Sequence, residues 1–186
     1  MGDPRKLRRR YEGPSHPWQL ERITVEKELV REYGLKNKRE LYKINTRIKN
    51  FTSIAKRLIA SSGEQTILET QQLFAKLHKL GLVAGSTILD DVLGLQPKAL
   101  LERRLQTILF RKGLARSVKQ SRQFISHEHV MVGSSKITSP GYLVAVDEEA
   151  SISVDPTSSL ASPDHPERVP IQKKARKPRR EPRRER

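Results

Sequence analysis

The stretch from Asn37 to Gly63 places the strongest constraint on the fold of this chain. Apolar residues recur in it in steps of three, four and one, which is the spacing of one helix face and not the alternation of a strand. Asn37 suits the start of such a helix as a cap, and Ser61-Ser62-Gly63 suits its end. The sequence therefore predicts one long helix that buries Leu41, Ile44, Ile48, Phe51, Ile54, Ala55, Leu58 and Ile59.

The remaining faces of this predicted helix are basic. Glu40 is the one acidic residue of the stretch, against Lys38, Arg39, Lys43, Arg47, Lys49, Lys56 and Arg57. The imbalance extends to the whole chain, in which 37 Lys and Arg residues oppose 21 Asp and Glu residues, for a formal net charge of +16. Such a surplus opposes compaction by self-repulsion and calls for a polyanionic partner, most commonly a nucleic acid. We therefore expect a phosphate-facing side on this helix.

Several kinds of site and partner are excluded. The chain has no cysteine, so it forms neither disulfides nor thiolate zinc sites. His127 and His129 have no nearby third ligand for a metal. Asp90 and Asp91 diverge by about 100° on a helix, so they do not converge as a catalytic pair. No apolar stretch approaches the roughly 20 residues of a membrane span. We expect no metal, no cofactor, no catalytic residue and no membrane partner, and an intracellular location.

Periodicity and composition divide the chain into four regions. Residues 1–18 are basic and interrupted by proline, and they predict an extended arm with aromatic anchors. Residues 19–102 predict a helical body, and residues 103–154 a small module. Residues 155–186 predict a tail that is disordered when free, because they hold six of the eleven prolines and end in a basic run. Within the body we expect helices at 19–33, 37–61, 66–82, 89–93 and from Pro97 onward.

In the module we expect two basic helices. The first ends at Gly113, and its apolar face is formed by Leu101, Leu105, Ile108 and Leu109. Arg104 and Arg111 are seven residues apart and share a different face. Ser117 caps the second helix, which runs to about His127 and turns inward the residues Val118, Ser121 and Ile125.

A short twisted antiparallel sheet is predicted after these helices. Apolar residues alternate around a turn at Gly133-Ser134 and continue from Tyr142 to Val146. Ile152 and Val154 add a last strand. The expected fold class is therefore α+β, with a mostly helical N-terminal body, a small module of two helices and a sheet, and a disordered basic C-terminal tail.

Charge is most concentrated in residues 103–136, where eight basic residues oppose the single acid Glu128. Folded RNA is recognised mainly by shape, phosphates and 2′-hydroxyls, and the planar fork of arginine suits phosphate oxygens. The helix start at Ser117 is a further anion site, besides its role as a cap. We predict RNA contacts from the module at Arg103, Arg104, Arg111, Lys112, Arg116, Ser117, Lys119, Arg122, His127, His129 and Lys136, and from the arm at Arg8, Arg9, Arg10 and Trp18.

Several separate stretches of the sequence resemble a known family. Glu102-Arg103-Arg104-Leu105-Gln106-Thr107, Arg111 to Ser117 and Arg122-Gln123-Phe124-Ile125 resemble the RNA-binding domain named after small-subunit ribosomal protein four. Gly2-Asp3-Pro4, His16-Pro17-Trp18, residues 33–40 and Leu89-Asp90-Asp91-Val92-Leu93 resemble the archaeal and eukaryotic form of that ribosomal protein family. The resemblance covers about residues 1–154.

The resemblance implies a structural ribosomal protein and not an enzyme. Such proteins bind small-subunit ribosomal RNA early in assembly and affect decoding accuracy through a neighbour, ribosomal protein five, beside the channel through which messenger RNA enters. It also implies a place in the cytoplasmic ribosome. Two alternatives share the same module. An RNA-modifying enzyme would need a catalytic domain, for which residues 1–100 are too short and too helical. A chaperone-like RNA binder would not need the long helical N-terminal half.

Two positions depart from the family pattern. Glu128 stands where members usually have a glycine that closes the helix with a positive φ, which is a costly conformation for glutamate. Gly133-Ser134 replaces the usual Asn-Gly turn of the hairpin. We expect a locally altered turn at both places.

Overall fold

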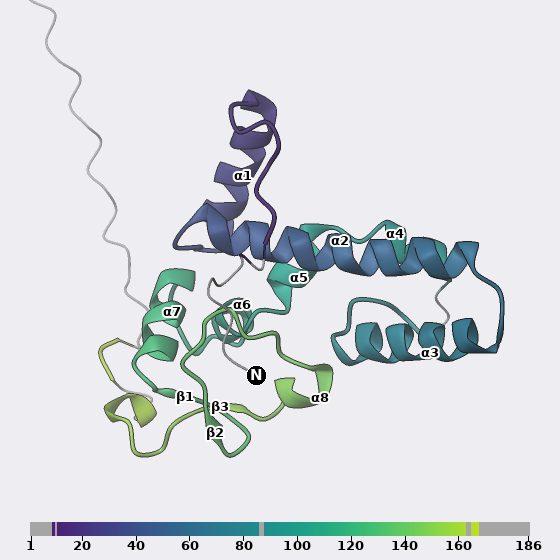
Figure 1. Cartoon of the computed structure of the whole chain (residues 1–186). Helices are drawn as coiled ribbons and strands as arrows, with labels where there is room; N and C mark the ends of the chain where they lie inside the picture. Colours follow the sequence, from purple (N-terminus) through teal and green to yellow (C-terminus); the bar gives the residue numbers. More distant parts are fainter. Residues whose placement is uncertain (1–8, 10, 86–87, 163–164, 168–186) are drawn as a thin grey trace, which may run out of the picture.

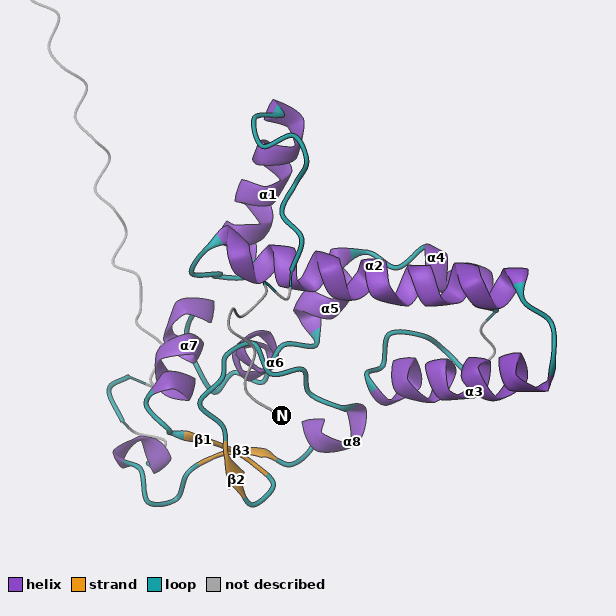
Figure 2. Ribbon diagram, viewed as in Figure 1, coloured by secondary structure: helices purple, strands orange, loops and turns teal. Residues whose placement is uncertain are grey.

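The computed structural model describes residues 9, 11–85, 88–162 and 165–167. They form a mostly helical body and a small module with a three-stranded antiparallel sheet (Figure 1 and Figure 2), which confirms the predicted α+β class. The body consists of α1 (Leu20–Glu32), α2 (Lys38–Ala60), α3 (Glu64–Lys79), α4 (Leu89–Leu93) and α5 (Pro97–Glu102). The module consists of α6 (Leu105–Arg111), α7 (Val118–Ser126), β1 (Val130–Val132), β2 (Ser135–Lys136), α8 (Val146–Glu149), β3 (Ile152–Val154) and a short 3-10 helix, Ser159–Ala161.

The long helix predicted after Asn37 is α2, and α3, α4 and α5 pack along it (Figure 1). The Asn37 side chain accepts a hydrogen bond from the backbone N of Glu40 at 3.2 Å, which confirms the predicted cap. Ile59 is 50% exposed, contrary to expectation, because it lies about 100° around the helix from buried Leu58. The rest of the predicted stripe is buried at Leu41, Ile44, Ile48, Phe51, Ala55 and Leu58, with Ile54 packed at its edge.

Helices α1 and α3 leave the long helix in different directions. In Figure 1, α1 projects from the start of α2, whereas α3 turns back and runs beside the far end of α2. Leu73 and Leu77 of α3 are buried in the body core. Ile67 and Leu68, near the start of α3, are 60% and 53% exposed. The apolar residues of α3 are therefore only partly used for the core.

The helix predicted to end at Gly113 is two helices, α5 and α6, because the chain is extended at Arg104, with ψ 139°. Arg104 forms a strand-like bridge with Leu143. As a result, Arg104 is turned into the interior and Arg111 outward, so the prediction that they share a face is wrong. Two hydrogen bonds hold the bridge, from the backbone N of Leu105 to the O of Tyr142 at 2.9 Å and from the N of Val144 to the O of Arg103 at 3.0 Å.

The sheet has the strand order β2-β1-β3, and both pairings are antiparallel. Val132 pairs with Ser135 across the turn and with Ile152 of the last strand, which confirms both the hairpin and the added strand. Gly133 has a φ of +61° and Ser134 does not have a positive φ. This combination is that of a type II′ hairpin, which differs from the Asn-Gly turn as expected.

The strand predicted to reach Val146 is wrong. Residues 142–145 contribute only the bridge to Arg104, and Val146 begins α8, where it is 48% exposed. The carboxylate of Glu148 accepts a hydrogen bond from the backbone N of Ala145 at 3.1 Å, which caps this short helix. The apolar alternation in the sequence therefore ends at Val144.

The turn after α7 keeps the left-handed geometry that glycine would favour. Glu128 has a φ of +64°, and the backbone N of His129 donates to the O of Phe124 at 3.0 Å, as in a Schellman motif. The expectation of an altered turn here is wrong, because the backbone pattern is kept and the strain is borne by Glu128. Three other helices end with the same bond to the residue five positions earlier, and there the left-handed residue is Gly34, Gly81 or Gly113.

The ordered chain extends beyond the predicted end of the module. Asp155 is buried and receives a hydrogen bond from Thr157, and Leu160 is 5% exposed within the module core. The prediction of disorder is therefore wrong for residues 155–162, where a single apolar side chain anchors the segment. The basic run, residues 173–186, lies outside the described residues.

Candidate nucleic-acid interface

Glu40 joins the helical body to the module through two arginines. Its carboxylate accepts hydrogen bonds from Arg122 of α7, from Nη2 at 2.6 Å and from Nη1 at 3.1 Å, and from Arg104 Nη2 at 2.9 Å. Burial favours the neutral form of Glu40, but the hydrogen bonds and positive charges of Arg122 and Arg104 outweigh it and hold the pKa of Glu40 below its usual value. The carboxylate is therefore ionised and ties three segments of the chain together.

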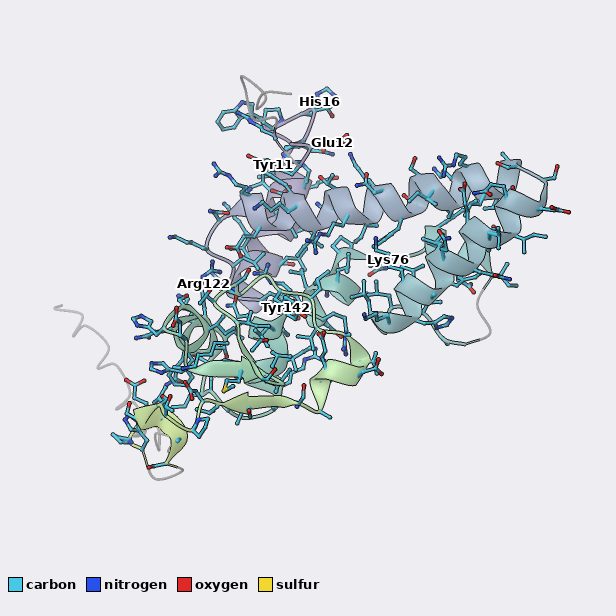
Figure 3. All side chains as sticks on the ribbon, turned by 60° about the horizontal axis from the view of Figure 1, so that its bottom comes forward. Tyr11, Glu12, His16, Lys76, Arg122 and Tyr142 are labelled. Atoms are coloured by element: carbon cyan, nitrogen blue, oxygen red, sulfur yellow. The ribbon has the colours of Figure 1, made fainter. Side chains whose placement is uncertain are left out.

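A basic hollow of about 340 Å³ opens next to this ion-pair cluster. Figure 3 shows Arg122 and Tyr142 on the side of the module that faces the long helix. Four cations and one carboxylate contribute to its wall, so its charge is positive. The hollow is lined by Glu40, Lys43, Ile44 and Arg47 of α2, by Arg104 and Arg122, and by Ser139, Pro140, Gly141 and Leu143.

Four other basic residues predicted to bind RNA have partners within the chain. Arg103 Nη1 lies 2.7 Å from Glu149, and Arg111 Nη2 lies 2.8 Å from Glu102. Lys112 donates to the backbone O of Glu149. These contacts hold α8 and the end of α5 against α6.

Lys136 lies 2.5 Å from the buried carboxylate of Asp155. Hydrogen bonds from Lys136 and Thr157 lower the pKa of Asp155 to about 2. Lys136 therefore connects β2 to the segment that follows the sheet.

Two cations without an acidic partner, Arg116 and Lys119, lie at the start of α7. Lys119 is exposed, and no described carboxylate pairs with it. Arg116 is half-buried, and its Nε and Nη2 have no hydrogen-bond partner among the described residues. The Ser117 hydroxyl accepts from the backbone N of Gln120 at 3.1 Å, which confirms the cap. This end of α7 is the part of the module whose positive charge is least neutralised.

The two histidines after α7 face each other. The rings of His127 and His129 are stacked, with centroids 6.2 Å apart and planes 6° apart. His129 Nδ1 lies 2.8 Å from the Ser158 hydroxyl, so one ring nitrogen has a partner within the chain. Across the part of the chain that the structure describes, no group of three or more His, Asp or Glu side chains could hold a metal ion.

The N-terminal arm lies partly on α2. The Arg39 guanidinium lies 6.0 Å from the centre of the Tyr11 ring, and Lys49 lies 3.1 Å from Glu12. Trp18 is 90% exposed, so its side chain is open to a partner, and the contact with RNA expected of it stays a prediction. Arg9 is exposed, and Arg8 and Arg10 lie outside the described residues.

Two cations of the hollow, Lys43 and Arg47, were not among the predicted contacts, although the sequence indicated a phosphate-facing side on their helix. They lie one turn apart on α2 and line the same hollow as Arg104 and Arg122. The signal that could have located them is Glu40, the one acidic residue on a basic helix. No helix among the described residues is both long and apolar enough to cross a membrane.

The chain is similar to known proteins over nearly its whole length. Residues 103–149 match the S4 domain. Small ribosomal subunit protein uS4 of Methanococcus aeolicus is 49% identical over 170 residues, which are 91% of this chain and 96% of that protein. The uS4 protein of Nanoarchaeum equitans is 48% identical over 170 residues, 90% of this chain and 94% of that protein. The likeness is therefore not confined to the module.

Proposed function

Because the chain belongs to the uS4 family of small ribosomal subunit proteins, we propose that it binds small-subunit ribosomal RNA as a structural component of that subunit. Its relatives are ribosomal proteins and not enzymes, so the chain is not an RNA-modifying enzyme. Similarity over about nine-tenths of the chain also disfavours a free-standing chaperone that shares only the S4 domain.

The observation that carries the proposal is the distribution of unpaired positive charge. The acidic groups Glu40, Glu102, Glu149 and Asp155 are already used in ion pairs, whereas Lys43, Arg47, Arg116 and Lys119 have no acidic partner among the described residues. Cations of this kind gain by displacing counterions from RNA phosphates. The hollow that Lys43 and Arg47 share with Arg104 and Arg122 spans the body and the S4 domain, so both would face one folded RNA.

We extend the proposal to the cellular roles that the family resemblance implies. The protein would nucleate assembly of the subunit body and support translational accuracy in the cytoplasmic ribosome. Its neighbours would include ribosomal protein five and messenger RNA at the channel through which it enters. Glu40, Arg104 and Arg122 hold the helical body and the S4 domain together. The protein would therefore present a preformed surface to RNA, which suits the nucleation of subunit assembly.

Affinity for a small-subunit ribosomal RNA fragment, measured over a range of salt concentrations, tests the proposal. If roughly six phosphates are contacted, the logarithm of the association constant should fall with the logarithm of salt with a slope of about −4 to −5. In cell extracts the protein should migrate with the small subunit on a sucrose gradient. Absence of RNA binding at low salt would refute the proposal.

A further inference from the structure

We propose that the basic hollow between α2, α7 and residues 139–143 binds a backbone phosphate of ribosomal RNA and thereby locks the helical body to the S4 domain. The inference rests on the proposed function, because it takes the phosphate from RNA. It goes further because it names the site that binds the phosphate. It also gives the phosphate a structural role, which is to hold the helical body and the S4 domain together.

The hollow holds more positive charge than its carboxylate can neutralise. Both oxygens of Glu40 are taken by the guanidinium groups of Arg104 and Arg122. Lys43 and Arg47, one turn apart on α2, line the same space, and no described carboxylate pairs with either. An anion that enters the hollow therefore meets two unpaired cations and two guanidinium groups that are already oriented.

Arg104 supplies a second, independent observation. Its side chain is 3% exposed, yet its Nε has no hydrogen-bond partner within the described residues. A buried donor without a partner is unfavourable, and burial lowers the pKa of Arg104 in spite of the nearby Glu40. An anion in the hollow would reduce the repulsion among Arg104, Arg122 and Arg47.

The chemistry of the wall favours a phosphate over a protein carboxylate. Guanidinium groups from two directions and a lysine suit an anion with several free oxygens. Another part of the wall is formed by Ser139, Pro140 and Gly141, and a Cβ placed on Gly141 would lie 3.9 Å from Arg104 Nη2, an ordinary van der Waals contact. This wall therefore leaves space beside Arg104. Because α2 belongs to the body and α7 to the S4 domain, one phosphate would contact both.

The first test removes the unpaired cations and leaves the ion-pair cluster intact. The full-length Lys43→Ala/Arg47→Ala variant is compared with Lys27→Ala/Lys56→Ala, which removes the same charge from exposed positions outside the hollow. We expect the hollow variant to bind a small-subunit ribosomal RNA fragment at least tenfold more weakly, with a salt slope shallower by about one to two. The control variant should lose clearly less affinity, and both variants should unfold at the wild-type temperature.

The possible outcomes separate the two proposals. If wild-type protein does not bind the RNA, the proposed function fails. If wild-type protein binds and the hollow variant binds equally well with the same slope, only the phosphate site is refuted. Equal losses in the hollow variant and the control would also refute it, because the effect would then be that of net charge alone.

A second test uses the absence of cysteine from the chain. Ser139→Cys, at the rim of the hollow, accepts a short photoreactive label, and Ser53→Cys on the exposed side of α2 serves as the control. In reconstituted small subunits, the label at position 139 should crosslink to ribosomal RNA and the label at position 53 should do so much less. A crosslink from position 139 to a ribosomal protein instead would assign the hollow to an acidic protein segment and overturn the inference.

Discussion

Glu40 and Arg122 are 82 residues apart in the sequence, yet their side chains form a two-pronged ion pair in which Nη2 lies 2.6 Å from Oε1 and Nη1 lies 3.1 Å from Oε2. The pair connects the long helix of the body to the second helix of the S4 domain. It gives a role to Glu40, the one acidic residue of a helix whose other charged residues are all basic. It also shows that Arg122, which the sequence assigned to RNA, has a structural partner within the chain.

Replacing this carboxylate should weaken the joint. In Glu40→Gln, the buried Arg104 loses its counter-charge, and we expect the free energy of unfolding to fall by about 1.5–3 kcal/mol, the range for hydrogen bonds to charged groups. Urea unfolding at neutral pH measures the loss. Glu69→Gln, which breaks the exposed pair with Arg57, is the control and should change stability by less than about 1 kcal/mol. Equal effects of the two substitutions would show that the Glu40 cluster is no stronger than a surface pair.

The same carboxylates predict how stability depends on pH. The pKa of Asp155 is lowered to about 2 from 3.8, and that of Glu40 is lowered from 4.5. A lowered folded-state pKa stabilises the fold above the unfolded value, and this contribution is lost as pH falls through the folded value. The urea midpoint should therefore decrease as the pH is lowered from about 5 to 2.

The Asp155→Asn variant shows how much of the pH dependence of stability comes from the Asp155 carboxyl. Its urea midpoint should be lower than that of the wild type at pH 6, and the difference should shrink as the pH falls toward the folded-state pKa of about 2, because Asp155 of the wild type then becomes protonated. Parallel curves for the two proteins over the whole range would contradict the assigned pKa of Asp155.

Glycine at position 128 should stabilise the protein. A left-handed conformation costs an ordinary residue about 1–2 kcal/mol, and glycine avoids this cost. Part of the stabilisation is offset, because glycine has more conformational entropy than glutamate in the unfolded chain. We expect Glu128→Gly to raise the free energy of unfolding by about 0.5–1 kcal/mol, measured by thermal or urea unfolding. Glu128→Ala keeps the strain and removes the charge, so it separates the two effects. A gain from alanine as large as that from glycine would point to charge and not to backbone strain.

Trp18 provides an intrinsic probe of the N-terminal arm, because it is the only tryptophan and is 90% exposed. Arg22 donates to the backbone O of His16 at 3.0 Å and of Pro17 at 2.9 Å, so the preceding loop is held in place. If Trp18 contacts RNA as we predict, an unpaired base can stack on the indole. The free protein should then show the emission of a water-exposed indole, and the RNA fragment should quench it.

Substitution of the same residue gives the energetic counterpart. Trp18→Ala should weaken RNA binding by about 1–3 kcal/mol, the range for one stacked base, without changing the melting temperature. Trp18→Phe keeps an aromatic face and should retain most of the affinity. Unchanged fluorescence of the wild type at RNA concentrations that saturate binding would remove Trp18 from the interface.

Features that depend on neighbouring residues were predicted well from the sequence. Asn37 and Ser117 cap helices because a short side-chain oxygen reaches a backbone N three residues later, and Pro97 opens a helix because its φ is already helical. The apolar stripe of α2 follows from helical periodicity alone. Gly113 ends α6 for a reason that is equally local, since glycine accepts a positive φ.

The tertiary structure decided which charged and apolar residues are internal, because their partners come from distant parts of the chain. Arg104 is extended and buried since it bridges Leu143 and meets Glu40, and neither residue is close to it in the sequence. Leu160 is ordered because it packs into the module core, and the proline-rich composition of its segment does not predict this contact. The sequence by itself determined that the chain is a basic α+β protein with the helices of its family. Which cations are neutralised within the fold, and which remain for RNA, depended on packing between segments more than sixty residues apart, as Glu40 and Arg104 are.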